Sequence, residues 1–169
     1  MVLKTIRYAE YENNLPQEGN HVIGTEINDE IVVFQAYKKS IAEFSVQHQF
    51  LGGEFSLNRM SWIKTSFLWM MYRSGWGSKE NQESILAIRL KKENFLKIIH
   101  SAVHTSFNEK EYGNIEIWKE KLQNSEVRLQ WDPDHDPHGQ KLKRKAIQLG
   151  LKGIILELKV IGAGLWPRV

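Results

Sequence analysis

An apolar and aromatic stretch at residues 59–77 constrains the fold of this chain more than any other feature. From residue 65 to residue 73 the stretch is apolar nearly all round, which is typical of a buried helix rather than one with a single face on a core. Thr65 or Ser66 can cap such a helix at its start, and Gly75 can end it. We therefore expect a buried, Trp-rich helix that packs on the rest of the domain.

Strand and helix patterns alternate irregularly along the remainder of the chain. Runs of β-branched and aromatic residues predict strands at 31–37, 84–90, 127–131 and 146–151. Helical spacing of apolar residues predicts helices at 40–50, 95–103 and 115–122. These helices do not have the length and order of βαβ crossovers, so we predict an α+β fold with a mixed or antiparallel central sheet.

The length of 169 residues predicts a single globular domain over 1–169. The absence of cysteine excludes disulfides, thiolate zinc sites and cysteine nucleophiles. No apolar run approaches the ~20 residues that span a bilayer, and the first eight residues lack the apolar core of a signal peptide. We expect a cytoplasmic protein with no membrane partner.

The net charge of +3 conceals a pattern of blocks. Residues 59–110 carry nine basic and four acidic side chains, and residues 137–169 carry seven and one. If the two blocks meet in space, they form a positively lined surface suited to a phosphate-bearing ligand or to nucleic acid. A solvated surface with unevenly distributed charge fits the same numbers.

Aromatic rings lie among cations within the 59–77 stretch. Arg59, Lys64 and Arg73 alternate with Trp62 and Tyr72, and stacking faces beside phosphate ligands are what a nucleotide or single-strand site needs. A cation in so apolar a stretch is unfavourable unless it pairs or lies at the mouth of a pocket. The apolar residues of the stretch are expected to be core.

The segment at 132–139 is rich in aspartate and histidine and is expected to be a loop, because it holds two prolines and a glycine. Its residue types suit a metal ion, yet their spacing matches neither an EF-hand nor a His-Glu-x-x-His helix, so we predict no metal site. His100 and His104 are four apart on one face of a predicted helix and are expected to be a surface pair.

Polar side chains at the ends of predicted strands are further candidates. Gln35 and Tyr37 point to one face of their strand, and Gln148 lies in the last strand beside Arg144. Each glutamine either joins a structural hydrogen-bond network or contacts a ligand.

Four segments together, at 31–37, 59–77, 127–133 and 146–151, resemble the family catalogued as domain of unknown function 4291. The resemblance runs from about Ile6 to about Gly153 and brings no established activity. Residues 12–28 look like an inserted loop, and the tail at 154–169 does not look like the usual ending of the family.

The order of elements is also similar to that of the NAD-using ADP-ribosyltransferases, especially those that modify nucleic acid. This similarity implies that Lys64 or Arg59 holds the pyrophosphate of NAD and that Tyr37, Trp62 or Tyr72 stacks on nicotinamide. It places Gln148 where a glutamate usually binds the ribose hydroxyl. Glutamine does not titrate, so it cannot act as a general base there.

The leading hypothesis is a nucleotide-handling enzyme of the ADP-ribosyltransferase type, with NAD as its cofactor and nucleic acid as a possible target. Its candidate catalytic residues are Gln148, Tyr37 and Lys64. Its candidate NAD-binding residues are Gln35, Arg59, Trp62, Ser66, Tyr72, Arg73, Trp131, Asp132 and Arg144. Two alternatives stay open: a non-catalytic module that binds RNA or single-stranded DNA, and a protein-interaction domain.

Overall fold

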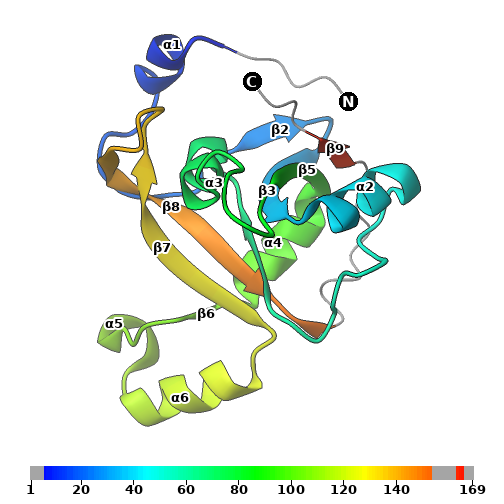
Figure 1. Cartoon of the computed structure of the whole chain (residues 1–169). Coiled ribbons are helices and arrows are strands. Elements are labelled where there is room, and N and C mark those ends of the chain that lie inside the picture. The colour runs from blue at the N-terminus through cyan, green and yellow to red at the C-terminus, as the bar shows by residue number, and fades with distance from the viewer. Residues whose placement is uncertain (1–5, 154–162, 166–169) are drawn as a thin grey trace.

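A mixed β-sheet of nine strands forms the centre of the molecule in the computed structural model, which describes residues 6–153 and 163–165 (Figure 1). In chain order the strands are β1 Gly19–His21, β2 Thr25–Ile27, β3 Glu30–Tyr37, β4 Ser61–Lys64, β5 Ser84–Lys91, β6 Val103–His104, β7 Val127–His135, β8 Lys141–Leu151 and β9 Ala163–Leu165. The helices are α1 Tyr8–Glu12, α2 Lys39–His48, α3 Phe67–Arg73, α4 Lys92–His100, α5 Glu109–Tyr112 and α6 Ile115–Asn124.

The strands are arranged in the order β6-β7-β8-β4-β3-β5-β9, with β1 beside β8 and β2 beside β3. Among the described strands, β1 with β8 and β6 with β7 are the parallel pairs, and the other neighbours run antiparallel. The prediction of a single α+β domain with a mixed sheet is confirmed. Its four predicted strands correspond to β3, β5, β7 and β8.

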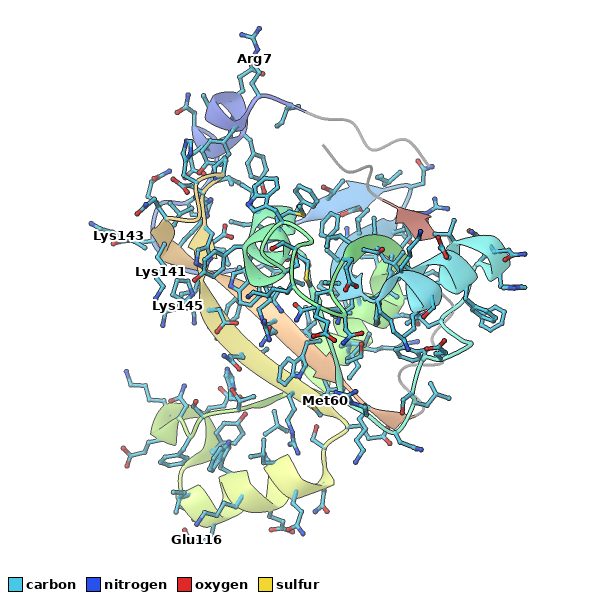
Figure 2. The ribbon with its side chains drawn as sticks, viewed as in Figure 1. Arg7, Met60, Glu116, Lys141, Lys143 and Lys145 are labelled. Atoms are coloured by element: carbon cyan, nitrogen blue, oxygen red, sulfur yellow. The ribbon has the colours of Figure 1, made fainter. Side chains whose placement is uncertain are left out.

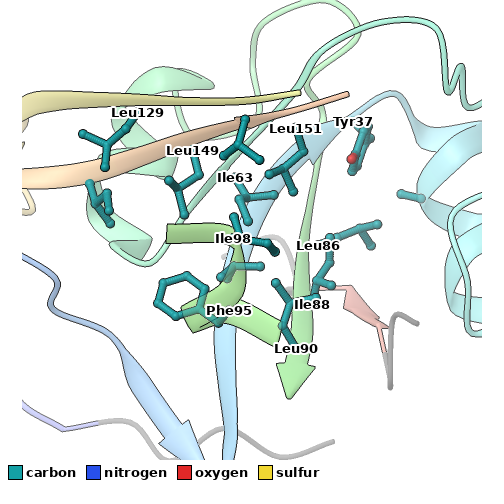
Figure 3. Close-up of a cluster of buried hydrophobic side chains, with 14 residues drawn as sticks. Tyr37, Ile63, Leu86, Ile88, Leu90, Phe95, Ile98, Leu129, Leu149 and Leu151 are labelled. Atoms are coloured by element: carbon teal, nitrogen blue, oxygen red, sulfur yellow. The ribbon is translucent and has the colours of Figure 1, made fainter. Parts of the chain in front are cut away.

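Apolar side chains gather in two clusters, because alternate residues of each strand point to opposite faces of the sheet. One cluster joins β3, β4, β5, β7 and β8 to α4, with Phe95 and Ile98 packed on the strands (Figure 3). The other joins Met70 and Met71 of α3 to alternate residues of β3 and β5, including Phe34. Helices α3 and α4 therefore cover the central strands from different sides.

The helix expected over 65–73 is present as α3, but it is not rich in tryptophan, because the tryptophans of the 59–77 stretch lie on three different pieces of the chain. Trp62 lies on β4, Trp69 is the single tryptophan of α3, and Trp76 follows the helix with 53% of its surface exposed. Pairing with β8 draws β4 into the sheet, and the Ser66 hydroxyl then accepts the backbone N–H of Trp69 and starts the helix. The helix has one buried face, and its Tyr72 is 44% exposed.

The expectation of a loop over 132–139 is wrong for its first half, residues 132–135. Strand β7 continues to His135, paired with β8 through Pro133 opposite Lys145. Proline cannot donate to a ladder, and the register shift between Pro133 and His135 accommodates it.

The expected pair of histidines on one helix face is also wrong. Helix α4 ends at His100, and His104 lies on β6, where the hydroxyl of Tyr112 contacts both its backbone N–H and its ring at 2.9 Å. Residue 104 is not helical because residues 103 and 104 pair with β7 as strand β6.

The segment at 12–28 is more than a loop, because it contains β1 and β2. The tail at 154–169 lies outside the described residues apart from 163–165, which form β9 beside β5. Within the described parts of the chain, no helix has the length and apolarity to cross a membrane.

Candidate functional site

A cavity of about 790 Å³ opens where β3 and β4 diverge. The two strands are paired at one described position, Phe34 opposite Lys64, and beyond it their backbones part. The gap is bridged at its far end by side chains, since the hydroxyls of Tyr37 and Ser61 lie 3.0 Å apart. The volume falls within the range of small-molecule sites, about 300–1,000 Å³.

Seven of the twelve predicted site residues line this cavity: Gln35, Tyr37, Arg59, Trp62, Lys64, Arg73 and Gln148. They come from β3, β4, α3, β8 and the segment before β4. Among the described lining residues, the 59–110 block contributes the cations Arg59, Lys64 and Arg73, whereas the 137–169 block contributes the neutral Gln148 and no cation. The roles assigned to them stay predictions.

Three polar side chains form a row across the sheet at one wall of the cavity. Lys64 on β4 is directly opposite Gln148 on β8, and Gln148 is directly opposite Gln130 on β7. The Lys64 ammonium donates a hydrogen bond to Oε1 of Gln148. Strand pairing thus fixes the spacing of all three groups.

Lys64 is 3% exposed and lies with its ammonium 3.9 Å from the centroid of the Trp69 ring. Burial lowers the pKa of its amine to about 7, because removing water disfavours the charged form. The Asp132 carboxylate opposes this lowering of the pKa, and the Arg73 guanidinium adds to it. Near neutral pH the lysine is therefore present as both ammonium and free amine.

Asp132 lies on the same face of β7 as Gln130 but is not among the residues that line the cavity. Its Oδ1 accepts a hydrogen bond of 2.6 Å from Nε2 of Gln130, and its Oδ2 is buried with no partner among the described residues. The carboxylate therefore acts on Lys64 electrostatically while Gln130 faces the cavity.

Two exposed arginines stand at the mouth of the cavity, Arg59 before β4 and Arg73 at the end of α3. Within 6–153 and 163–165, neither guanidinium has an ion-pair partner. By contrast, Lys38, another cation that lines the cavity, is paired with Glu54. The mouth therefore offers two uncompensated cations to an anionic ligand.

The two predicted aromatic residues of the cavity, Trp62 and Tyr37, differ in how they could contact a ligand. Trp62 is half-buried, and its ring rests on Gly150 so closely that a Cβ there would lie 2.9 Å from Cη2. Tyr37 is 8% exposed, its ring meets the edge of Phe55, and burial raises the pKa of its hydroxyl to about 12. Trp62 can offer a ring face to a ligand, whereas Tyr37 can offer only a neutral hydroxyl.

Gln35 adds another half-buried amide to the cavity. Its Oε1 is buried with no partner among the described residues, and its Nε2 reaches the Ala36 carbonyl at 3.4 Å. A buried carbonyl oxygen without a partner is unfavourable by about 1–3 kcal/mol, so a ligand or a water donor at this point would stabilise it.

The other five predicted residues lie elsewhere. Asp132 is described above, Trp131 packs on the apolar cluster beside α4, and Tyr72 stacks on His135 with ring centroids 3.8 Å apart. Ser66 donates to Asp134 at 2.7 Å.

Arg144 is 1% exposed and forms a buried ion-pair network rather than part of the cavity. Its Nε contacts Asp134 at 3.0 Å, and its Nη2 contacts Glu12 at 2.8 Å. These contacts raise the pKa of the guanidinium and lower that of the Glu12 carboxyl. The network ties α1 to β7 and β8.

Sequence reasoning missed several polar residues that line the cavity, among them Ser61, Asn81, Gln82 and Gln130. Gln130 carried a usable signal, because the alternation of 127–131 places it on the polar face of its strand. In the described residues, no group of three or more histidine, aspartate or glutamate side chains could hold a metal ion.

A family model described as Domain of unknown function (DUF4291) matches residues 21–160 of the chain. The match begins within the 12–28 segment and continues past Gly153 into the tail. No curated protein matches the chain.

Proposed function

This chain belongs to the DUF4291 family, and we propose from its cavity that it is a nucleotide-handling enzyme that uses NAD as ADP-ribosyltransferases do. The observation that supports the proposal is that one cavity of about 790 Å³ brings together an aromatic face, half-buried amides and two arginines that have no ion-pair partner among the described residues. A dinucleotide has a matching part for each of these groups: its diphosphate for the cations, its two flat rings for the aromatic face, and its ribose hydroxyls for the amides.

Arg59 and Arg73 are assigned to the diphosphate. Arginine binds phosphate oxygens through paired N–H donors and stays charged at any physiological pH. Both guanidinium groups stand at the mouth without an acidic partner in the described parts of the chain, so a diphosphate would not have to displace one.

Trp62 and the amides are assigned to the nicotinamide riboside half of NAD. The Trp62 ring, held on Gly150, offers a stacking face. Gln35 and Gln148 offer carbonyl oxygens and N–H groups for ribose hydroxyls and the carboxamide. Breaking the bond between C1′ of the ribose and nicotinamide creates an oxocarbenium-like cation, which fixed carbonyl dipoles stabilise.

Thermal unfolding with a ligand panel tests this assignment. We expect NAD and ADP-ribose at millimolar concentration to raise the melting temperature, since a ligand that binds only the folded state stabilises it, and nicotinamide alone to raise it less. Arg59→Ala and Arg73→Ala should reduce the shift. Arg7→Ala is the matched control, because Arg7 is exposed and projects far from Met60, a cavity residue (Figure 2). If NAD at millimolar concentration leaves the melting temperature of the wild type unchanged, the proposal fails.

A second function, binding of single-stranded nucleic acid, is favoured by a different surface. Three exposed lysines occupy every second position at the start of β8 and lie together at one edge of the molecule: Lys141, Lys143 and Lys145 (Figure 2). Trp76 is a further exposed stacking face. Fluorescence anisotropy with a mixed oligonucleotide pool should show binding that weakens steeply with salt and weakens further when the three lysines become alanine. Salt-insensitive or absent binding would contradict this function.

A further inference from the structure

We infer that Lys64 is the general base of the cavity, accepting the proton of the group that attacks NAD, a role that the amide of Gln148 cannot fill. The inference rests on the proposed function and extends it by naming the group that titrates during transfer.

The first argument concerns the groups that contact the Lys64 amine. Lys64 lies at the wall of the cavity, and its contacts are the neutral carbonyl of Gln148 and the ring of Trp69. No carboxylate in the described part of the chain forms an ion pair with it. An amine held without a counter-ion loses its proton easily, whereas one in a salt bridge does not.

The second argument concerns the charged groups that face Lys64 from neighbouring elements. Asp132 on β7 favours the ammonium, but Gln130 engages one of its oxygens, while Arg73 on α3 favours the free amine. The balance with burial leaves the pKa at about 7, which is where a general base works best at neutral pH.

The third argument is elimination among the described residues that line the cavity. Tyr37 keeps its proton because burial raises its pKa to about 12. Glu54 is exposed and paired with Lys38, and the arginines do not titrate. Among the described residues that line the cavity, this leaves Lys64 as the group that can accept a proton at neutral pH.

The step balances with water as the attacking group. The bond between C1′ and the nicotinamide nitrogen breaks, and nicotinamide leaves as a neutral molecule with the electron pair of that bond. The water oxygen forms the new bond to C1′, and its proton passes to the neutral amine of Lys64. The products are ADP-ribose, nicotinamide and the Lys64 ammonium, which returns its proton to solvent.

The test combines NAD binding by calorimetry with NAD hydrolysis measured as nicotinamide release, so that water is the acceptor. Lys64→Gln and Lys64→Arg should bind NAD within about threefold of the wild type but hydrolyse it about 10²- to 10⁴-fold more slowly. Adding Gln148→Glu to Lys64→Gln should raise the rate of NAD hydrolysis at least tenfold above that of Lys64→Gln alone, because it places a titrating group at the position directly opposite residue 64. Lys97→Gln, an exposed lysine of α4, is the control.

A direct readout of Lys64 itself accompanies the kinetics. The Cε signal of ¹³C-labelled lysine that disappears in Lys64→Arg should titrate near neutral pH in the wild type, far below the usual ~10.4 of lysine. Hydrolysis within threefold of wild type in either Lys64 variant, or a Lys64 titration above pH 9, would overturn the inference alone. Failure of the wild type to bind NAD would instead overturn the proposed function, and the inference with it.

Discussion

Lys64 and Gln148 stand directly opposite each other on β4 and β8, and the lysine ammonium donates its hydrogen bond to the amide oxygen of the glutamine. The pairing joins two segments that are 84 residues apart in the sequence. It fixes a titrating amine and a non-titrating amide at one wall of a cavity whose mouth carries two unpaired arginines in the described part of the chain. The chemistry proposed above depends on this relationship.

Burial of Lys64 should make the stability of the protein depend on pH. The amine has a pKa of about 7 when folded and about 10.5 when unfolded. Between these values the unfolded chain binds more protons, so the free energy of unfolding rises with pH, by up to about 1.4 kcal/mol per pH unit. Below pH 7 both states are protonated and the full penalty of burial remains.

Urea unfolding of the wild type and of Lys64→Met at several pH values measures this effect. The difference in unfolding free energy between the two proteins should favour the methionine variant most near pH 6 and should shrink toward pH 10. A difference that stays constant over this range would show that Lys64 is not held with a lowered pKa.

The closeness of Gly150 to Trp62 predicts an effect on both stability and ligand binding. A Cβ at Gly150 would lie 2.8 Å from Sδ of Met60 and 2.9 Å from the Trp62 ring, so Gly150→Ala should displace the ring and destabilise the fold by about 1–3 kcal/mol. NAD affinity should fall with it. In a double-mutant cycle with Trp62→Leu, the two substitutions should be clearly non-additive; simple additivity would show that the ring does not rest on Gly150.

The fold was predictable where local patterns decide it. The runs at 31–37 and 84–90 became β3 and β5 because they are buried from both sides, which their continuous apolar character already indicates. The end of β7 was not predictable, because pairing with β8 overrides the local turn preference of Pro133. Strand β4 was not predictable for the same reason, since pairing with β8 is what makes residues 61–64 a strand.

The sequence indicated which types of residue form the site, but not which individual residues line the cavity. Lys64, Arg73 and Gln148 stand out as cations and amides in apolar surroundings, and the structure brings them to one cavity. Arg144 has the same local signal, yet its partner Glu12 lies 132 residues away. Its other partner, Asp134, is ten residues away, but the sequence alone does not show that β7 and β8 pair so as to bring the two side chains together.

Arg144 should therefore act on stability rather than on ligand binding. Arg144→Met leaves Asp134 buried without its cation, and breaking such a pair from one side is unfavourable by about 3–5 kcal/mol. Thermal unfolding should show a large loss, and Arg144→Lys should recover only part of it, because lysine lacks the fork that reaches both acids. If Arg144→Met keeps its melting temperature but loses NAD binding, Arg144 belongs to the ligand site after all.

Substitution of the two charged neighbours should move the pKa of Lys64 in opposite directions. The Asp132 carboxylate raises it and the Arg73 guanidinium lowers it. Asp132→Asn should therefore shift the Lys64 titration to lower pH, and Arg73→Ala should shift it to higher pH, as followed by the ¹³Cε signal of Lys64. Movement of both variants in the same direction would contradict the electrostatic account.

Calorimetric titration of NAD into the wild type, Arg59→Ala and Arg73→Ala tests the central claim most directly, since both side chains stand exposed at the mouth of the cavity. Loss of a charge-assisted hydrogen bond lowers affinity by about 1.5–3 kcal/mol, so each variant should bind NAD at least about tenfold more weakly than the wild type with an unchanged melting temperature. Heat of binding that is absent from the wild type at millimolar NAD, or equal in all three proteins, would contradict the assignment of this cavity to NAD.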